Sequence, residues 1–567
     1  MDKQEAYKLL QKKLGDFEKE YRSDRQVAYQ PPLNREDPYA PVHMGAYELK
    51  VGGRAYSVYI PSSLRPPGAG VFIFWDGGEQ EHPENNQEWR KIAELMGCVL
   101  IFLFSQDGWD KEQLESHWNY ANQVYADALA DDLYHIGFFY GRHFVLGIGS
   151  GAYPAAVCSL MWNRRLSGFS IFGDCRIEKE FLEAVHTYFS DMIPDINGGN
   201  MPIPAWIFGS TGNISLLAEL LKNAGCSGDK SQNGNTFIWK MAFSTDGEIR
   251  FNPMEDGEPP AELIISFLMN YRRTDSLSGW IQKKQISENM GLVKYETILE
   301  GRHRYWLIAT PLKMDKKKKY PLVLALHGYT DTGEGFAERS GWSFLAQKYD
   351  IIVAFPTAYP YDRYQEGGRL CWLPAWNCGI YPRDDNLDDV AFLKIVLKET
   401  QERYAINKSK IYVTGHSNGS RMTQKLMREF PVFAAYGPVG ATETARNGKP
   451  FPFREPGTRP TWCIMSQYDV GDAARLEPDS DTFKYLNYMA TINQCDLTQT
   501  ESYTDENFSH RIYKNKSGKP ILRFSMLKNF PHAYPPKIAE ILWNYFRKWE
   551  TDKDGEPRYR GIVEHRL

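Results

Sequence analysis

One pentapeptide, Gly415-His-Ser-Asn-Gly419, places a hydroxyl nucleophile between two glycines. A β-type run precedes it at 410–414, and a helical run follows at 421–427. The order strand, tight turn, helix is typical of a nucleophile elbow, where larger side chains at the glycine positions would collide with the neighbouring strand and helix. With 46 glycines in the chain the bare pattern is weak, so its context carries the prediction. We expect Ser417 to be exposed at the carboxyl edge of a sheet in a strained conformation.

A serine hydroxyl needs a base, and the base needs an orienting carboxylate. After an elbow of this kind the chain order is serine, then acid, then histidine. Asp469 follows an apolar run and has the expected place for the acid, with Asp472 as the alternative in the same loop. Two histidines remain downstream: His510 lies in a polar stretch, whereas His532 lies between an apolar strand and the last helix. The predicted catalytic residues are therefore Ser417, Asp469 and His532.

Two backbone N–H groups are candidates for an oxyanion hole. One belongs to Asn418, directly after the nucleophile, and the other to Tyr329, in the loop that ends the first parallel strand at His327-Gly-Tyr329. Gly328 would allow the backbone to approach a substrate closely. We expect His327 to lie beside the substrate because it ends this strand.

An aromatic loop at 370–381 carries Trp372 and Trp376. Their rings could stack on a sugar or phenolic group, or they could belong to the core; both interpretations remain open at this stage. Cys371 and Cys378 flank the loop. Two free thiols are expected, although the pair could form a disulfide in oxidising surroundings.

The elements that must position these residues alternate between short β-type runs and helical segments, which predicts an α/β fold with a mostly parallel sheet. Residues 276–290 are polar and without periodicity, so we place a linker there between domains at 1–275 and 291–567. Asp388 and Asp389 precede a helical run, where acids cap and charge the first turn.

The two halves share landmarks in the same order, which predicts two tandem copies of one unit. The matched pairs are a strand pair with a glycine turn (47–61 and 295–311), an apolar strand with a small-residue loop (71–78 and 322–329), the elbow (144–152 and 412–420), a later strand (204–210 and 460–466) and a Pro-Pro-led helix (259–265 and 535–541).

The first copy lacks the catalytic groups. Gly149 stands at the position of Ser417, Asn213 opposite Asp469, and Asp256 about opposite His532, while Asp76 stands at the position of His327. Ser150, one position late, would still need a base, and His143 lies inside the preceding strand. We predict a non-catalytic first domain that shapes the active-site entrance, binds part of a substrate, mimics a dimer partner or is purely structural.

Several linked motifs of the second half resemble those of polyhydroxybutyrate depolymerase-like esterases, a group similar to the feruloyl and acetylxylan esterases of carbohydrate esterase family one. They are Leu326-His-Gly-Tyr329, Cys371-Trp372, Asp388-Asp-Val390, the elbow at 411–419 and His532-Ala-Tyr-Pro535. The resemblance covers about 290–550 and implies a serine esterase of α/β-hydrolase fold, without metal or organic cofactor. It maps nucleophile, acid and base onto Ser417, Asp469 and His532. The acid loop departs from the pattern, because Ser466-Gln-Tyr-Asp469 replaces the usual His-Gly before the acid.

Composition excludes some partners. The 67 Lys and Arg against 71 Asp and Glu give a net charge of −4, which argues against nucleic acid. No apolar stretch is long enough to span a membrane.

The eight Cys include no CxxC, so a thiolate zinc site is not indicated. The start of the chain has no apolar signal core, which predicts a cytoplasmic protein if Met1 is the natural start. The oligomeric state is left open.

These expectations converge on a carboxylic ester hydrolase acting on a small-molecule or oligosaccharide ester. Feruloyl or related hydroxycinnamoyl esters of plant cell-wall carbohydrate are the preferred substrates, with acetylxylan and hydroxyalkanoate oligomers as alternatives. A peptidase on the same fold, or a carbohydrate-binding or scaffold protein that has lost activity in both halves, is the competing interpretation.

Overall fold

The structure is a computed structural model. It describes residues 1–21, 37–41, 43–65, 68–105, 108–128, 141–162, 165–190, 203–209, 211–226, 230–241, 247–253, 260–273, 281–283, 290–364, 370–379, 387–443, 451–453, 457–469, 477, 479–534 and 537–560. The chain divides into two compact units. The first comprises Met1–Arg35, Tyr39–Lys284 and Arg363–Trp372, and the second comprises Glu36–Pro38, Gln285–Asp362 and Leu373–Leu567.

The first unit is built on a sheet of order β1-β2-β4-β3-β5-β6-β7-β10-β9-β8. Its strands from β4 to β10 along this order are parallel, and the outer strands are antiparallel. The elements are α1 (Lys3–Leu14), β1 (Gly45–Val51), β2 (Arg54–Ile60), β3 (Ala69–Phe74), α2 (Gln87–Met96), β4 (Cys98–Leu103), α3 (Leu114–Ala128), β5 (His143–Ile148), α4 (Ala152–Met161), β6 (Leu166–Phe172), α5 (Lys179–Phe189), β7 (Ala205–Gly209), α6 (Ile214–Asn223), β8 (Lys230–Asn233), β9 (Thr236–Lys240), β10 (Glu248–Pro253), α7 (Ala261–Met269), β11 (Tyr271–Arg273) and β12 (Ile281–Lys283).

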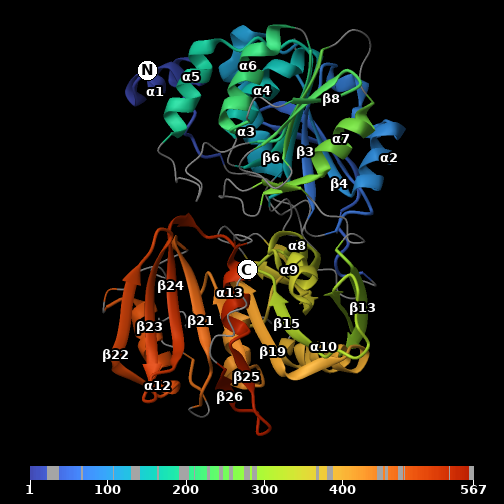
Figure 1. The fold of residues 1–567 in the computed structure, drawn as a ribbon. Coiled ribbons are helices and arrows are strands. Elements are labelled where there is room, and N and C mark those ends of the chain that lie inside the picture. Colours follow the sequence, from blue (N-terminus) through green and yellow to red (C-terminus); the bar gives the residue numbers. More distant parts are fainter. Residues whose placement is uncertain are drawn as a thin grey trace. The chain divides into compact units, whose positions relative to one another are not determined.

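The second unit is built on a sheet of order β13-β14-β16-β15-β19-β20-β21-β24-β23-β22 (Figure 1). The remaining elements of the chain are β13 (Leu292–Leu299), β14 (Arg302–Ala309), β15 (Tyr320–Leu326), α8 (Gly333–Arg339), α9 (Trp342–Tyr349), β16 (Ile352–Pro356), β17 (Pro360–Tyr364), β18 (Leu370–Pro374), α10 (Asp389–Arg403), β19 (Ile406–His416), α11 (Asn418–Glu429), β20 (Ala435–Val439), β21 (Thr461–Tyr468), α12 (Asp481–Ile492), β22 (Cys495–Thr504), β23 (Phe508–Asn515), β24 (Pro520–Pro531), α13 (Lys537–Phe546), β25 (Trp549–Thr551) and β26 (Pro557–Tyr559).

The two sheets have the same strand order. When each strand is ranked by its place along the chain and the separate β17–β18 pair is set aside, the order in both sheets is 1-2-4-3-5-6-7-10-9-8. The predicted α/β class with a largely parallel sheet is confirmed by these described strands and helices. The proposed linker at 276–290 is described only at β12 and Met290, so most of it lies outside the described residues.

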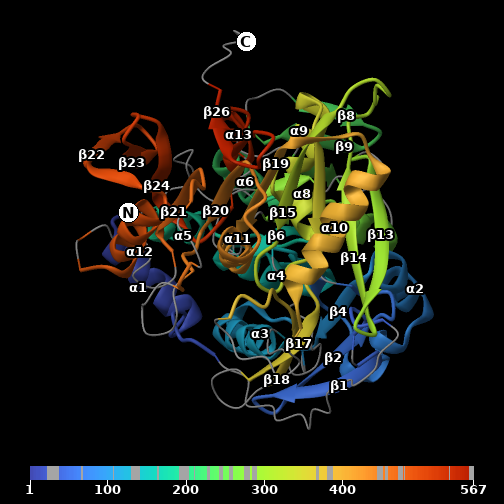
Figure 2. The same ribbon diagram turned by 90° about the horizontal axis from the view of Figure 1, so that it is seen from below.

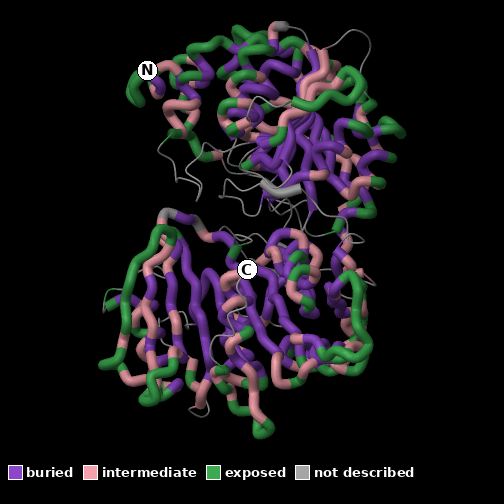
Figure 3. The backbone as a smooth tube through the Cα atoms, in the orientation of Figure 1, coloured by how far each residue is buried: buried purple, intermediate pink, exposed green. Residues whose placement is uncertain are grey.

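Each sheet is covered by helices on both faces, because its central strands are apolar on both sides. In β15, Leu322 and Leu324 join one core cluster with residues of α10, α11 and α12, whereas Val323 and Ala325 join another with residues of α8, α9 and α13. Figure 2 shows these helices and strands from a second direction. Figure 3 colours each residue by its burial, and buried residues run through the central strands of both units.

The paired acids before α10 have different structural roles. Asp388 is the N-cap, and its side chain accepts the Ala391 N–H at 3.0 Å, as expected for a capping residue. Asp389 is fully buried, lies 2.7 Å from Arg304 and also accepts the Asn377 N–H at 2.6 Å. The second carboxylate therefore ties the loop around Asn377 to the start of α10.

Candidate active site

The turn between β19 and α11 holds Ser417 at a positive φ outside the ordinary regions for an L residue, with φ 54° and ψ −111°. A Cβ on Gly415 would lie 2.3 Å from the Gly419 carbonyl oxygen, and a Cβ on Gly419 would lie 2.3 Å from that of Leu326. No side chain fits at either glycine unless the backbone moves. The structure thus contains the strained strand–turn–helix expected of a nucleophile elbow.

His532 lies between the serine and an acid. Its Nε2 is 2.8 Å from the Ser417 Oγ, and its Nδ1 is hydrogen-bonded to the Asp469 Oδ1. Asp469 follows β21, His532 follows β24, and these two strands are neighbours in the sheet. The three residues predicted as nucleophile, acid and base therefore come together at one edge of the second sheet.

The Asp469 carboxylate is held from both sides. Its Oδ2 accepts the Ser466 N–H at 2.5 Å, and only 6% of the residue is exposed. Burial raises the pKa of this carboxyl, while the hydrogen bond and charge of His532 act in the opposite direction. Asp472, the alternative acid, lies outside the described residues.

Asn418 follows the nucleophile in the chain, and the loop residue before Tyr329 lies close to it. A Cβ on Gly328 would be 3.6 Å from the Ser417 Cβ, so the loop that carries Tyr329 passes close to the serine. Asn418 is the first residue of α11, where a backbone N–H has no acceptor within the helix. The Asn418 side chain accepts the Trp376 N–H at 2.6 Å and donates to the Trp376 carbonyl at 3.3 Å.

Two residues expected to touch substrate are buried instead. Trp376 is 2% exposed, and its indole N–H donates to the His327 carbonyl at 2.9 Å. His327 has no exposed surface, and its Nε2 accepts the Ala358 N–H at 2.9 Å. Burial lowers the pKa of His327 to about 4, so this ring is a neutral structural group. The burial of Trp376 favours the interpretation that it belongs to the core, and the burial of His327 does not agree with the expectation that it contacts substrate.

The other aromatic-loop residues are only partly described. Trp372 lies in β18, but its side chain is outside the described residues, as is that of Cys371. Cys378 is buried, and its sulfur accepts a hydrogen bond from the Asn418 side-chain amide at 3.3 Å. A disulfide between Cys371 and Cys378 therefore stays untested.

A neighbouring histidine was not singled out from the sequence. His416 precedes the nucleophile, is 2% exposed and stacks on His532 with ring centroids 5.0 Å apart and planes 28° apart. Arg339 Nη2 lies 3.3 Å from the His416 Nδ1, and the same guanidinium forms a buried ion pair of 2.7 Å with Asp331. The only sequence signal for His416 is its place inside the elbow motif.

The first unit has a similar turn between β5 and α4, with Gly149 at the position that aligns with Ser417. Gly149 has φ 58°, close to the value at Ser417. A Cβ on Gly147 would lie 2.9 Å from the Gly151 carbonyl, and a Cβ on Gly151 would lie 2.3 Å from that of Phe74, the last residue of β3. These are the same close approaches that Gly415 and Gly419 make.

An aspartate fills the space above this elbow. The Ser150 N–H donates to the Asp76 Oδ1 at 2.8 Å, and the Ser150 hydroxyl bonds the same oxygen. A Cβ on Gly149 would lie 2.1 Å from the Asp76 Oδ2. Asn213 is buried and bonds the Cys175 N–H and the Gly173 carbonyl, each at 2.9 Å. Asp256 lies outside the described residues.

His143, the other histidine considered for this unit, does not face the elbow serine. It begins β5, is buried, and its Nδ1 is 2.6 Å from the Tyr125 Oη. Burial lowers its pKa to about 3, so it stays neutral. The expectation that it cannot act as a base for Ser150 agrees with these contacts.

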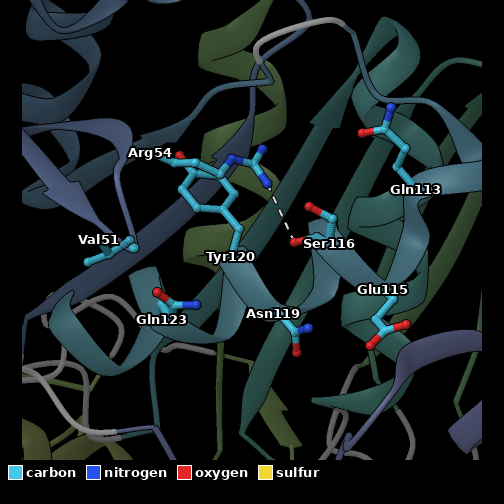
Figure 4. Close-up of a pocket in the computed structure, with 9 residues that line it drawn as sticks. Val51, Arg54, Gln113, Glu115, Ser116, Asn119, Tyr120 and Gln123 are labelled. Carbon is cyan, nitrogen blue, oxygen red and sulfur yellow. Dashed lines mark hydrogen bonds between the residues drawn. The ribbon is translucent and has the colours of Figure 1, made fainter.

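A pocket of about 520 Å³ in the first unit contains none of the residues predicted for the site (Figure 4). The Arg54 guanidinium stacks 3.7 Å above the Tyr120 ring and donates to the carbonyls of Ser116 and Phe104, at 3.4 and 3.0 Å. Its cation thus ties β2 to α3 and to the end of β4. The lining residues are Val51, Gly52, Arg54, Gln113, Glu115, Ser116, Asn119, Tyr120 and Gln123.

A cluster in the first unit has side chains of metal-ligating types. His82 Nδ1 lies 3.0 Å from a Glu48 oxygen and 3.2 Å from a Glu84 oxygen. Glu84 is buried and also accepts hydrogen bonds from Ser57 and Asn85. These contacts form a histidine–carboxylate hydrogen-bond network that lies outside the serine site.

Within the described part of the chain, no helix combines the length and the apolar character needed to cross a bilayer.

Comparison with known proteins identifies esterases as relatives. The chain is similar to poly(3-hydroxyalkanoate) depolymerase C of Paucimonas lemoignei, with 27% identity over 244 residues, which are 38% of this chain and 55% of the relative. It is also similar to acetylxylan esterase A of Aspergillus ficuum, with 30% identity over 119 residues, which are 21% of this chain and 36% of the relative. The chain thus spans about half or less of the length of these relatives. The resemblance predicted from the motifs is confirmed by them.

No family model matches the chain. Among solved structures, it is similar to the acetyl xylan esterase of Aspergillus awamori, with a TM-score of 0.33 and 16% identity over 45% of this chain and 99% of that chain. It is also similar to the feruloyl esterase module of Clostridium thermocellum, with a TM-score of 0.31 and 10% identity over 50% and 95%. These similarities are low, and the fold assignment stands on the described elements themselves.

Proposed function

We propose that the protein is a serine carboxylesterase whose second unit carries out acyl transfer. The observation that carries the proposal is the position of His532, which contacts the Ser417 hydroxyl through one nitrogen and the buried Asp469 carboxylate through the other. This is the arrangement that a weak hydroxyl nucleophile needs. The esterase relatives support the same chemistry.

The proposed reaction has two halves. Ser417 Oγ attacks the ester carbonyl carbon while His532 Nε2 takes its proton, and the resulting oxyanion is held by the backbone N–H groups of Asn418 and Tyr329. Collapse expels the alcohol, which receives the proton from His532. Water then attacks the acyl-enzyme with His532 again as base, which releases the acid and restores Ser417. Asp469 keeps the imidazole in the required tautomer throughout.

We propose an ester of a carbohydrate fragment or a hydroxyalkanoate oligomer as substrate. Acetylxylan esterases and a polyhydroxyalkanoate depolymerase among the relatives support this class. The burial of Trp376 removes one argument for an aromatic acyl group. Feruloyl, acetyl and hydroxybutyryl esters are therefore equally supported as substrates. Hydrolysis of methyl ferulate, an acetylated xylo-oligosaccharide and a 3-hydroxybutyrate oligomer, measured side by side, separates the three.

We further propose that the first unit, about residues 1–275, is a hydrolase-like domain without catalytic function, joined to the catalytic domain at 291–567. The shared strand order and the matching elbows at Gly149 and Ser417 support a common origin. The glycine in place of the nucleophile, and the Asp76 carboxylate bonded to the Ser150 N–H, support the loss of activity.

Two serine substitutions test the proposal. Ser417→Ala should reduce kcat for p-nitrophenyl acetate by at least about 10³-fold, because the acyl-enzyme cannot form. Ser150→Ala is the matched control and should keep the wild-type rate. A Ser417→Ala variant that retains near wild-type turnover contradicts the catalytic assignment. A wild-type protein that binds glycans but has no turnover supports the carbohydrate-binding alternative instead.

A further inference from the structure

We propose that His416 is a positioning residue for His532: it holds the ring of the base in register with Ser417 and is itself fixed by Arg339 and Asp331. The inference rests on the proposed function, since it concerns the residue that acts as base there. It adds three side chains to the site, none of which touches the reacting atoms.

The imidazole rings of His416 and His532 are in contact. Their centroids are 5.0 Å apart and their planes differ by 28°, so the flat face of His416 covers one face of His532. Gly440 lies at the same place, because a Cβ on it would be 3.2 Å from carbons of both rings. The two hydrogen bonds of His532 fix its edges, and the face of His416 limits its motion out of the ring plane.

The His416 ring is oriented by its contact with Arg339. A guanidinium has only donors, so the contact of 3.3 Å from Arg339 to the His416 Nδ1 requires a lone pair on that nitrogen. The proton of the neutral ring is therefore on Nε2. Tyr534 packs edge-on against the ring at 5.8 Å, and its hydroxyl accepts the Trp342 indole N–H at 2.9 Å. His416 thus lies in a rigid, buried setting.

Arg339 is itself held in place by an ion pair with Asp331. It pairs with Asp331 at 2.7 Å with both side chains 1% exposed, and the other Asp331 oxygen accepts the Thr332 N–H at 2.9 Å. Asp331 is two residues from Tyr329, one of the proposed oxyanion donors. The chain of contacts Asp331–Arg339–His416 therefore connects the oxyanion loop to the catalytic base.

The arrangement also decides which ring is protonated. Burial, Arg339 and His532 together hold the pKa of His416 far below its usual range, so this ring stays neutral. The proton released by Ser417 consequently remains on His532, beside Asp469. In the first unit, Ile148 occupies the position in the elbow that aligns with His416.

Two variants separate the ring face from the hydrogen bond to Arg339. His416→Gln keeps an acceptor for Arg339 and loses the ring, whereas His416→Phe keeps the ring and loses the acceptor. Misplacement of a catalytic group by about 1 Å costs about 10²-fold, so His416→Gln should lower kcat by about that factor with KM unchanged. His416→Phe should retain a clearly larger kcat. His510→Gln, which alters a histidine paired with Asp505 away from Ser417, is the control and should keep wild-type kcat.

Each kcat is expressed per active serine, titrated with a fluorophosphonate, so that loss of folded protein does not count as loss of rate. If His416→Gln does not fold, His416→Met, which also lacks a flat ring, replaces it. A kcat of the ring-less variant within twofold of wild type, or an equal loss in His416→Phe, overturns the positioning role. A wild-type protein that is neither labelled nor active overturns the proposed function instead.

Discussion

At the scale of single residues, the chemistry depends on which nitrogen of His532 faces which partner. The ionised Asp469 carboxylate only accepts hydrogen bonds, so Nδ1 carries the proton of the neutral ring. The lone pair of Nε2 then points to the Ser417 Oγ, 2.8 Å away, which is the tautomer that general-base catalysis requires. In the proposed mechanism, the buried Asp469 therefore determines the reactivity of Ser417 through His532.

Asp469→Asn tests this dependence. The amide donates where the carboxylate accepts, which favours the wrong tautomer of His532, so kcat should fall by about 10³- to 10⁴-fold while KM changes little. The measurement is steady-state hydrolysis of p-nitrophenyl acetate. Asp505→Asn alters a different Asp–His contact, in which Asp505 lies 2.9 Å from His510, and should have wild-type kcat. Equal losses in both variants would point to a general fold effect.

The three catalytic candidates could be predicted from the sequence because their chain order and the elements around them follow a rule. The burial of Trp376 could not, because a tryptophan in an irregular loop has no periodicity that separates core from surface. His416 was also missed as a supporting residue. Its contacts to Arg339 and His532 join segments far apart in the chain, and only the fold brings them together.

At the level of elements, a close backbone approach and buried ion pairs hold the candidate site. The elbow places α11 so near β15 that Gly419 admits no side chain. The Arg304–Asp389 pair joins β14 to the start of α10, and Asp389 also holds the N–H of Asn377. The loop around Asn377 is thus attached to a helix and a strand that carry none of the proposed catalytic residues.

Gly419→Ala should destabilise the second unit and abolish hydrolysis, because the new methyl group would lie 2.3 Å from the Leu326 carbonyl oxygen. Overpacking of this kind costs about 1–3 kcal/mol or more. Thermal unfolding and esterase rate check it together. Gly78→Ala meets only the flexible end of Gln80, at 3.3 Å, and should leave both unchanged. An active, stable Gly419→Ala would contradict the described elbow.

The adjacent acids before α10 give a matched pair of substitutions. Asp389→Ala leaves Arg304 buried without its partner carboxylate and should cost about 3–5 kcal/mol of unfolding free energy. Asp388→Ala removes only an N-cap and should cost about 1 kcal/mol. Urea unfolding of both variants measures the difference. Equal costs would show that the buried pair is no stronger than the cap.

At the scale of the whole molecule, one strand order occurs twice while the catalytic set is described once. The order of elements and their α/β class could be predicted from alternating apolar runs, whereas the carboxylate of Asp76 above the first elbow could not. A strand-end aspartate followed by two glycines is typical of a turn, and only the three-dimensional contact to the Ser150 N–H shows what it fills.

The stability of the first unit should depend on pH through His143. Its pKa in the folded state is lowered to about 3, whereas an unfolded histidine titrates near 6.5. As the pH falls below that value the unfolded chain takes up a proton and the native chain does not, so stability falls with falling pH. The loss attributable to His143 should reach about 2 kcal/mol at about pH 5.

Urea unfolding of wild type and His143→Gln, each at about pH 7 and about pH 5, measures this contribution. The glutamine keeps a hydrogen-bonding partner for the Tyr125 hydroxyl but does not titrate. Wild type should lose about 2 kcal/mol more than the variant between the two pH values, in the transition that the substitution shifts. Equal losses would mean that His143 titrates in the native state as it does in the unfolded chain.

Ser417 is proposed to be an activated nucleophile. Incubation with a fluorophosphonate, followed by intact mass and peptide mapping, tests it directly, because the reagent forms a stable bond only with a serine that a base has activated. We expect one phosphonyl group per chain, located on Ser417 and absent from Ser417→Ala. An unlabelled protein, or a label on Ser150, would contradict it.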